Sequence, residues 1–246
     1  MSVLLQAELL KLRTTRTFFA LVGSALGITL VFAVLSGLLS DFEDKEAARL
    51  LFVGDFTGVF ILLLGAMGMA GEWRHRTITS TVLAAPDRLK LLAAKTLSYA
   101  VAGVVVSFVV TGALMLVGTI ILSSRGQVTL PATDLVDVMW RNLVVAAYLG
   151  AFGVCIGAIV RNQVAAIVGL LIWGLVVEST LFFVVEDVAK FAPINGAPGG
   201  IIDVTFEEGE GAAELLEPVV AALVMLGWVG GLFVIGALLL RRRDLT

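Results

Sequence analysis

Residues 71–95, GEWRHRTITSTVLAAPDRLKLLAAK, lie between two long apolar runs and decide how the chain is organised. The stretch holds seven charged residues and the only histidine, His75. It is too polar to cross a bilayer, and its apolar part before Pro86 is too short, because a spanning helix needs about 20 mostly apolar residues. The chain therefore leaves the apolar phase after one run, forms a basic amphipathic insert, and re-enters the apolar phase with the next run.

The composition of the whole chain is that of a membrane protein. Of its 246 residues, 59% are hydrophobic and 15% are charged, and the mean hydropathy is +1.03. An ordinary soluble domain has about 25% charged residues. The single cysteine, Cys155, excludes an internal disulfide framework and a cysteine metal cluster. Twelve Arg against five Lys, with abundant Ala, Val and Gly, is typical of a GC-rich bacterial genome.

Six runs are long and apolar enough to span a bilayer, so the sequence predicts an all-α membrane protein with six transmembrane helices in one domain, 1–246. The predicted spans are 18–39, 50–70, 95–122, 141–160, 164–185 and 218–240. The loop 186–217 is rich in Gly and Pro, which break regular helices. We expect it to be an external loop whose flanks form short helices.

The basic residues are distributed unevenly between the two sides of the membrane. Twelve of the 17 Lys and Arg residues lie in the N-terminal segment, in the 71–95 insert, at Arg161 or at the C-terminal end. The cytoplasmic side of a membrane protein carries the excess of Lys and Arg. The sequence therefore predicts that both termini and the insert are cytoplasmic.

Residues 1–17 are predicted to form an amphipathic helix that lies in the membrane interface. Three leucines share one face and three charged residues are expected at the lipid headgroups: Leu5, Leu9 and Leu12 against Glu8, Lys11 and Arg13. The alternative is a cytoplasmic continuation of the first spanning helix.

No group of residues in the sequence is typical of an enzyme. His75 stands alone in a cytoplasmic loop, and no G-x-x-x-x-G-K-[ST] phosphate-binding loop occurs. We therefore expect a non-catalytic chain without a cofactor of its own. If ATP powers the protein, ATP and Mg²⁺ are bound by a separate ATPase polypeptide.

Two charged residues are expected within the membrane, where a charge costs about 2.5–3.5 kcal/mol and so marks a paired or functional site. Glu178 lies 17 residues after Arg161, which is about 25 Å along a helix. Arg141 reaches a similar depth on the neighbouring antiparallel span. Two interpretations remain open: a structural ion pair between Arg141 and Glu178, or a place for Glu178 in the substrate path.

The insert itself favours a docking role. On a helix, Ile78, Val82 and Leu83 form a small apolar face with the arginines elsewhere, and Pro86 fits the first turn of a new helix. A basic rim around an apolar face suits a groove on a soluble partner. The alternative is a basic loop held at the lipid headgroups.

ELLKLRTTRTFF before the first span and GEWRHRTITSTVLAAPDRLKLLAAK after the second resemble the permease subunits of ABC-2 type exporters. In that family an E-Y-R-x-G-T-…-L-x-A-x-P-x-R stretch follows the second span, and the part before the proline is the coupling helix that docks on the ATPase. The matching residues are Glu72, Trp73, Arg74, Thr77, Leu83, Ala84, Pro86 and Arg88. Arg76 stands where the family often has glycine. The layout of six spans and a basic first loop is similar as well.

The resemblance implies a subunit of a bacterial ABC exporter in the inner membrane. Its partners would be ABC ATPase subunits, a second identical or homologous permease, and membrane lipids, with no nucleic acid. The resemblance and the docking interpretation together assign ATPase coupling to segment 71–92, and to Glu72, Trp73, Arg74, Arg76, Thr77, Ile78, Leu83, Pro86 and Arg88. The alternative is an ion-coupled secondary transporter or channel that needs no ATPase.

Overall fold

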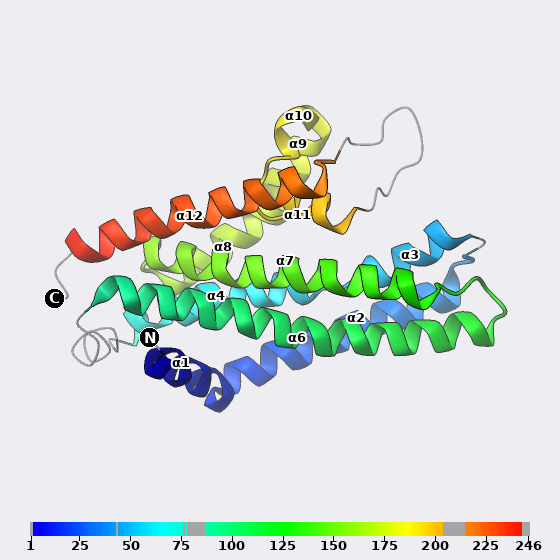
Figure 1. The fold of residues 1–246 in the computed structure, drawn as a ribbon, viewed down its shortest axis with the longest axis horizontal. Helices are drawn as coiled ribbons and strands as arrows, with labels where there is room; N and C mark the ends of the chain where they lie inside the picture. The colour runs from blue at the N-terminus through cyan, green and yellow to red at the C-terminus, as the bar shows by residue number, and fades with distance from the viewer. Residues whose placement is uncertain (1, 43, 76, 78–86, 204–214, 243–246) are drawn as a thin grey trace.

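The computed structural model describes residues 2–42, 44–75, 77, 87–203 and 215–242. Within these ranges the regular structure is helical, and six segments are long and apolar enough to cross a membrane. The predicted all-α class with six spans is confirmed. The helices form an elongated bundle in which α1 and the end of α12 lie at the same end (Figure 1).

The elements follow the chain in a simple order. They are α1 (Ser2–Thr14), α2 (Arg16–Leu39), α3 (Lys45–Val53), α4 (Thr57–Arg74), α6 (Arg88–Ser124), α7 (Ala132–Ile159), α8 (Gln163–Ile172), the π-helix η1 (Trp173–Glu178), α9 (Ser179–Val184), α10 (Glu186–Ala189), α11 (Gly196–Ile202) and α12 (Pro218–Arg242).

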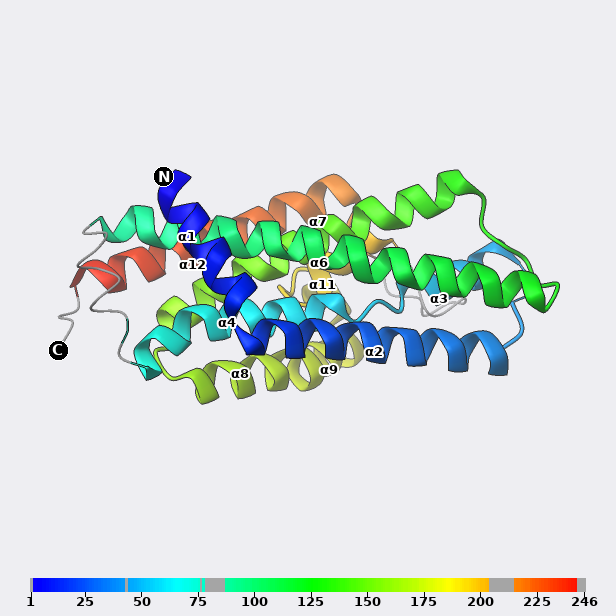
Figure 2. The same cartoon turned by 90° about the horizontal axis from the view of Figure 1, so that it is seen from below.

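The centre of the bundle is built by α4, α6 and α7. They run side by side, with α2 beside α6, α8 beside α4 and α12 beside α7 (Figures 1 and 2). A side chain at Gly153 of α7 would place its Cβ 2.2 Å from the carbonyl oxygen of Leu62 in α4. Small residues allow such close approach of helix backbones, which drives helix packing in lipid.

The second predicted span, 50–70, is not one continuous helix. The chain breaks at residues 54–56, between α3 and α4. Asp55 accepts a hydrogen bond from the backbone N–H of Thr57 over 2.7 Å, and so satisfies one of the free donors at the start of α4. A side chain at Gly54 would place its Cβ 2.4 Å from the ring of Phe32. Hydropathy misses this break because the residues around it are apolar.

Two helices extend well beyond the predicted spans. α6 begins at Arg88 rather than at residue 95, and the carboxylate of Asp87 caps it by accepting from the N–H of Lys90. α7 begins at Ala132 rather than at residue 141, so Arg141 lies inside the helix. The added turns carry charged residues, Arg88 and Lys90 in α6 and Asp134 and Asp137 in α7. Charged residues end an apolar run, so hydropathy underestimates both lengths.

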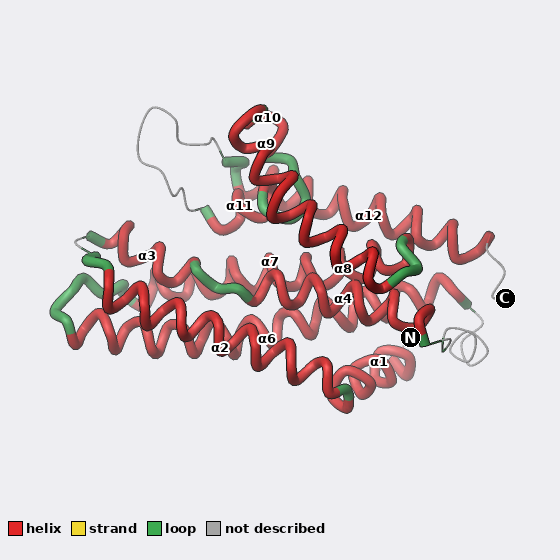
Figure 3. The backbone as a smooth tube through the Cα atoms, turned by 180° about the vertical axis from the view of Figure 1, so that it is seen from behind, coloured by secondary structure: helices red, strands yellow, loops and turns green. Residues whose placement is uncertain are grey.

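The fifth span changes its helical type before it ends. α8 passes into the π-helix η1 and then into α9. Figure 3 shows the chain continuing from α9 to α10, which stands out from the bundle, and returning through α11 toward α12. Of the short helices expected in the flanks of the 186–217 loop, α10 lies in the first flank. The expectation is wrong for α11, which forms within the Gly- and Pro-rich stretch itself, while residues 215–217 of the second flank are not helical and residues 204–214 lie outside the described ranges.

Candidate functional site

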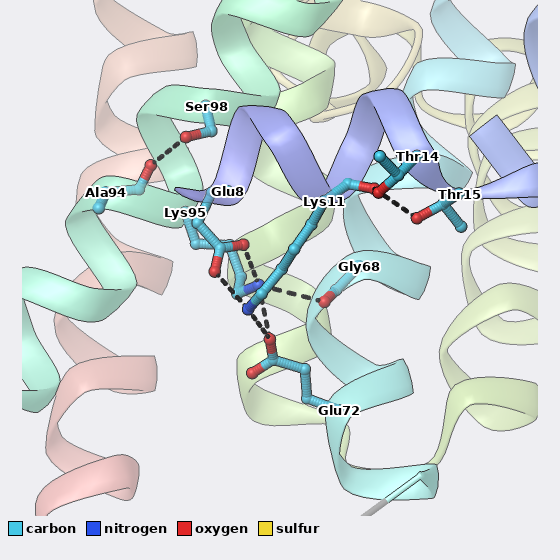
Figure 4. A network of polar contacts seen from close by, with 9 residues as sticks. All are labelled: Glu8, Lys11, Thr14, Thr15, Gly68, Glu72, Ala94, Lys95 and Ser98. Atoms are coloured by element: carbon cyan, nitrogen blue, oxygen red, sulfur yellow. Dashed lines mark hydrogen bonds and ion pairs between the residues drawn. The ribbon is translucent and has the colours of Figure 1, made fainter. Parts of the chain in front are cut away.

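Four charged side chains from three helices meet at the end of the bundle that carries α1 (Figure 4). They are Glu8 and Lys11 of α1, Glu72 of α4 and Lys95 of α6, and we call them the ion cluster. Lys95 Nζ lies 2.5 Å from Glu8 Oε2 and 3.0 Å from Glu72 Oε1. Lys11 Nζ lies 2.8 Å from Glu8 Oε1 and 3.2 Å from Glu72 Oε1. Two ammonium groups therefore balance two carboxylates.

Most of the ion cluster is withdrawn from solvent. Lys95 is 1% exposed, Glu8 3% and Glu72 9%, whereas the side chain of Lys11 is 51% exposed. An isolated buried charge is costly, so each buried member depends on the opposite charges beside it. The contact between Lys95 and the two carboxylates is consequently the core of the cluster.

The amphipathic pattern of α1 explains why Glu8 is buried. Leu12 is 6% exposed and Leu9 packs against the same apolar core. Glu8 lies one turn before Leu12 and therefore shares its face. That face packs on the bundle, so the expectation that Glu8 lies at the lipid headgroups is wrong. Lys11 and Arg13 are exposed.

The electrostatics of the ion cluster favour the charged form of Glu8. Burial by itself raises the pKa of the Glu8 carboxyl. The Lys95 ammonium, together with hydrogen bonds from Lys11 and Lys95, lowers it by more, so the pKa of Glu8 lies below its ordinary value. Glu8 is therefore ionised at neutral pH.

A cavity of about 540 Å³ lies beside the ion cluster. Its wall includes all four cluster residues, the apolar side chains of Phe18 and Leu64, and Thr77 at the base of the predicted coupling segment. The ion cluster and the first residues of that segment therefore border one space.

The described residues of the coupling segment fall into two groups. Trp73 and Arg88 are anchored to the bundle: the guanidinium of Arg161 lies 4.4 Å from the centre of the Trp73 ring, and Arg88 donates to the carbonyl of Leu240 in α12. Arg74 and Thr77 are exposed, and Arg74 Nη1 donates to Gln163 Oε1 at the start of α8 over 3.5 Å. Arg76, Ile78, Leu83 and Pro86 lie outside the described residues, so the predicted coupling helix does too.

The family model described as "ABC-2 family transporter protein" matches residues 4–177. The chain belongs to this family. The match begins in α1 and ends in η1, and it includes the whole ion cluster and the segment between α4 and α6. No curated protein matches the chain. The protein is thus a multi-pass membrane permease of an ABC-type transporter.

The predicted ion pair between Arg141 and Glu178 is not formed in this ABC-2 permease. Arg141 Nε lies 2.8 Å from Asp137 Oδ2, and Arg141 Nη1 donates to the carbonyl of Ile201 over 2.8 Å and lies 3.4 Å from Asp203. The early start of α7 places Asp137 one turn before Arg141. The arginine therefore finds its anion on its own helix and fastens the end of α11.

Glu178 is fully buried and is held by hydrogen-bond donors. It accepts from Trp173 Nε1 over 2.8 Å and from the backbone N–H groups of Ile194 and Asn195 over 3.0 and 2.5 Å. The side chain of Asn195 in turn donates to the carbonyl of Gly174. These contacts support a structural role: Glu178 fastens the segment before α11 to the fifth span.

Sequence reasoning missed the central member of the site, Lys95. It stands at the edge of an apolar run, where a lysine is ordinarily explained as a residue at the headgroups. The signal for Glu8 was present, because it falls on the same helical face as Leu5 and Leu12. The residues around Glu8 in the sequence do not indicate that its partner is Lys95 of α6.

Proposed function

We propose that this permease is the membrane subunit of an ATP-driven ABC-2 exporter and that residues 71–92 receive force from separate ATPase subunits. Membership of the ABC-2 family supports the transporter class. The observation that carries the coupling role is the ion pair of Glu72 with Lys95, 3.0 Å apart, at the base of this segment.

The ion pair links α4 and α6, the two helices on either side of the coupling segment. Glu72 lies in the last turn of α4, and Lys95 lies in the first part of α6. Because breaking one partner out of a buried pair costs about 3–5 kcal/mol, the two helices resist separation when the segment is pushed. Glu8 adds α1 to the same rigid unit.

Two further contacts distribute a push on the segment to other helices. Trp73 stacks under Arg161, which lies between α7 and α8. Arg88 is bonded to Leu240 near the end of α12. A displacement of the segment is thereby transmitted to α1, α8 and α12 as well as to α4 and α6.

Arg74 and Thr77 are exposed beside this rigid base. We assign them to the docking surface, with Arg76, Ile78, Leu83 and Pro86 completing it. Charges at the rim of an interface mainly set register and association rate, while apolar contacts hold the complex. Glu72, Trp73 and Arg88 act behind that surface as transmitting residues.

The remaining features of the exporter are part of the same proposal. Two permeases, identical or homologous, enclose the substrate path, and both termini face the cytoplasm of a bacterium. The permease itself is non-catalytic, and the ATPase subunits bind ATP and Mg²⁺. Closure of the ATPase pair tilts the docked segments and opens the path outward.

A charge reversal tests the docking surface. We expect Arg74→Glu to reduce capture of the ATPase about tenfold or more in pull-downs from the same membranes, with normal amounts of folded permease. Arg241→Glu is the matched control, because Arg241 is an exposed cation at the same end of the bundle but outside the segment. Equal capture by Arg74→Glu, Arg241→Glu and the unaltered protein would contradict the docking role.

A second variant separates docking from transmission. Glu72→Gln is expected to retain ATPase capture and ATP hydrolysis but to lose the ATP-dependent change at the far end of the bundle. That change is measured as thiol labelling of Ser124→Cys, at the exposed end of α6; the native Cys155 is buried. Undiminished ATP-dependent labelling in Glu72→Gln would show that the ion cluster does not transmit force.

A further inference from the structure

A second cavity, of about 270 Å³, lies at the break between α3 and α4. Its wall also includes residues of α6, α7 and the α11 region. Asp55 and Glu72 are 17 residues apart, which corresponds to about 26 Å of helix, so the cavity lies far from the ion cluster. Polar groups line one part of it and apolar side chains line the rest: Asp55, Thr57, Ser107 and Asn142 against Val145, Leu149, Ile194 and Ile202.

Asn142 lies in the wall of this cavity and carries an amide NH₂ group without a hydrogen-bond partner. It lies on α7 and is 7% exposed, and its Nδ2 is buried without a hydrogen-bond partner. Buried polar groups in folded proteins are nearly always hydrogen-bonded, so an orphaned amide in a cavity wall calls for an explanation. An acceptor oxygen on a bound molecule satisfies it.

Asp55 places a carboxylate in the cavity wall, and this carboxylate forms no ion pair with a described residue. It accepts hydrogen bonds from the N–H and hydroxyl of Thr57 and from the hydroxyl of Thr111. A carboxylate has about four acceptor sites, so these three bonds leave capacity for a further donor. Among the described residues that line the cavity, none is Lys or Arg. At the ion cluster, by contrast, the carboxylates of Glu8 and Glu72 are balanced by Lys95.

The two groups together restrict the ligand. A carboxylate attracts a cation, and the unpartnered NH₂ group of Asn142 needs an acceptor atom. An organic cation can carry such an acceptor, whereas a bare metal ion has none. The apolar part of the wall favours a hydrocarbon body. The volume is at the lower limit for small-molecule pockets, about 300 Å³, so the molecule is small.

We propose that this cavity is a binding site for a small organic ammonium ion that also carries a carbonyl or hydroxyl oxygen. The ammonium group donates to Asp55, the oxygen accepts from Asn142, and the body packs against Val145 and Leu149. If the export function proposed above holds, such molecules are the substrate class. Binding is a property of the permease alone and is measured without ATPase, so the two proposals can fail separately.

The test is calorimetry on the purified permease with three matched probes. Leucinamide carries the ammonium group, a carbonyl and an isobutyl body; N-acetyl-leucinamide lacks the positive charge; isoamylamine lacks the carbonyl. We expect leucinamide to bind at least tenfold more tightly than either of the others. No binding of leucinamide at concentrations on the order of 10 mM, or equal binding of N-acetyl-leucinamide, overturns the proposal. Displacement of leucinamide by sodium at equal concentration would indicate a metal-ion site and would overturn it too.

Variants assign the two contacts. Asn142→Leu leaves no bonded partner behind, because Nδ2 has none, so the permease should fold. Asn142→Leu should weaken the binding of leucinamide at least tenfold and leave the binding of isoamylamine unchanged. Asp55→Asn should weaken the binding of both amines. Its control is Asp41→Asn, because Asp41 is a carboxylate whose side chain is 78% exposed. Unchanged leucinamide binding in Asn142→Leu overturns the proposal even if Asp55→Asn fails to fold.

Discussion

The ion cluster and the Glu178 site bury the same chemical group in two different ways. At the ion cluster, the carboxylates of Glu8 and Glu72 are balanced by the ammonium group of Lys95. Glu178 is buried more completely and accepts from two backbone N–H groups and an indole N–H. A buried carboxylate can thus be stabilised by a full opposite charge or by several oriented dipoles.

The two arrangements differ in what they connect. Glu8, Glu72 and Lys95 join three helices at the base of the coupling segment, and Lys95 lies 87 residues from Glu8 and 23 from Glu72 in the chain. Glu178 binds residues that follow it by less than twenty positions. A charged pair between helices suits the transmission of force, and a carboxylate held by backbone N–H groups suits a fixed local turn.

The largest effect is expected from Lys95→Met. The substitution leaves two buried carboxylates with only the half-exposed Lys11 for compensation, and breaking a buried pair in this way costs about 3–5 kcal/mol. We expect a large loss of thermal stability, measured on the detergent-solubilised protein. Adding Glu8→Gln removes one stranded charge and should recover part of the loss.

Lys11→Met is the matched control for Lys95→Met. Lys11 contacts the same two carboxylates, but its side chain is 51% exposed, and exposed ion pairs contribute about 0–1 kcal/mol. Equal losses in Lys11→Met and Lys95→Met would show that burial of Lys95 does not decide the strength of the cluster.

Glu178→Gln is expected to have an intermediate effect. The three groups that face the carboxylate are donors, so the amide nitrogen of Gln meets a donor and leaves it unsatisfied, at a cost of about 1–3 kcal/mol. Arg141 shares no partner with Glu178, so the effect of adding Arg141→Gln should be additive in thermal unfolding. Recovery of stability in the double variant would restore the ion-pair interpretation.

The smallest effect is expected from acidification at Glu8. Its pKa is lowered in the folded protein, so its ion pairs stabilise the fold above the ordinary carboxyl pKa. That contribution is lost as the pH falls through the lowered folded pKa, because the carboxyl then becomes protonated. The difference in unfolding temperature between the unaltered protein and Glu8→Gln should therefore shrink in acid. A constant difference from neutral to acid pH would contradict an ionised Glu8.

The presence of six helices long enough to span a membrane could be predicted from the sequence, although not all of their ends. The starts of α2 and α12 lie within two residues of the predicted spans at 18 and 218. A segment in lipid must be apolar and must satisfy its own backbone hydrogen bonds, so an apolar run of sufficient length forms a helix wherever it packs. The family resemblance of segment 71–95 was equally local, and the family match confirmed it.

The partners of the polar residues were decided by the tertiary structure alone. Hydropathy placed Glu178 inside the membrane but could not supply its donors at Ile194 and Asn195, because they reach it only after the chain folds back. It also gave no reason to place Lys95 beside Glu8, or to break the second span at Asp55. A membrane span can be predicted because its apolar residues are neighbours in the chain. An ion pair or hydrogen bond instead needs two particular atoms at a distance of about 3 Å. For residues on different helices, only the folded bundle determines that distance.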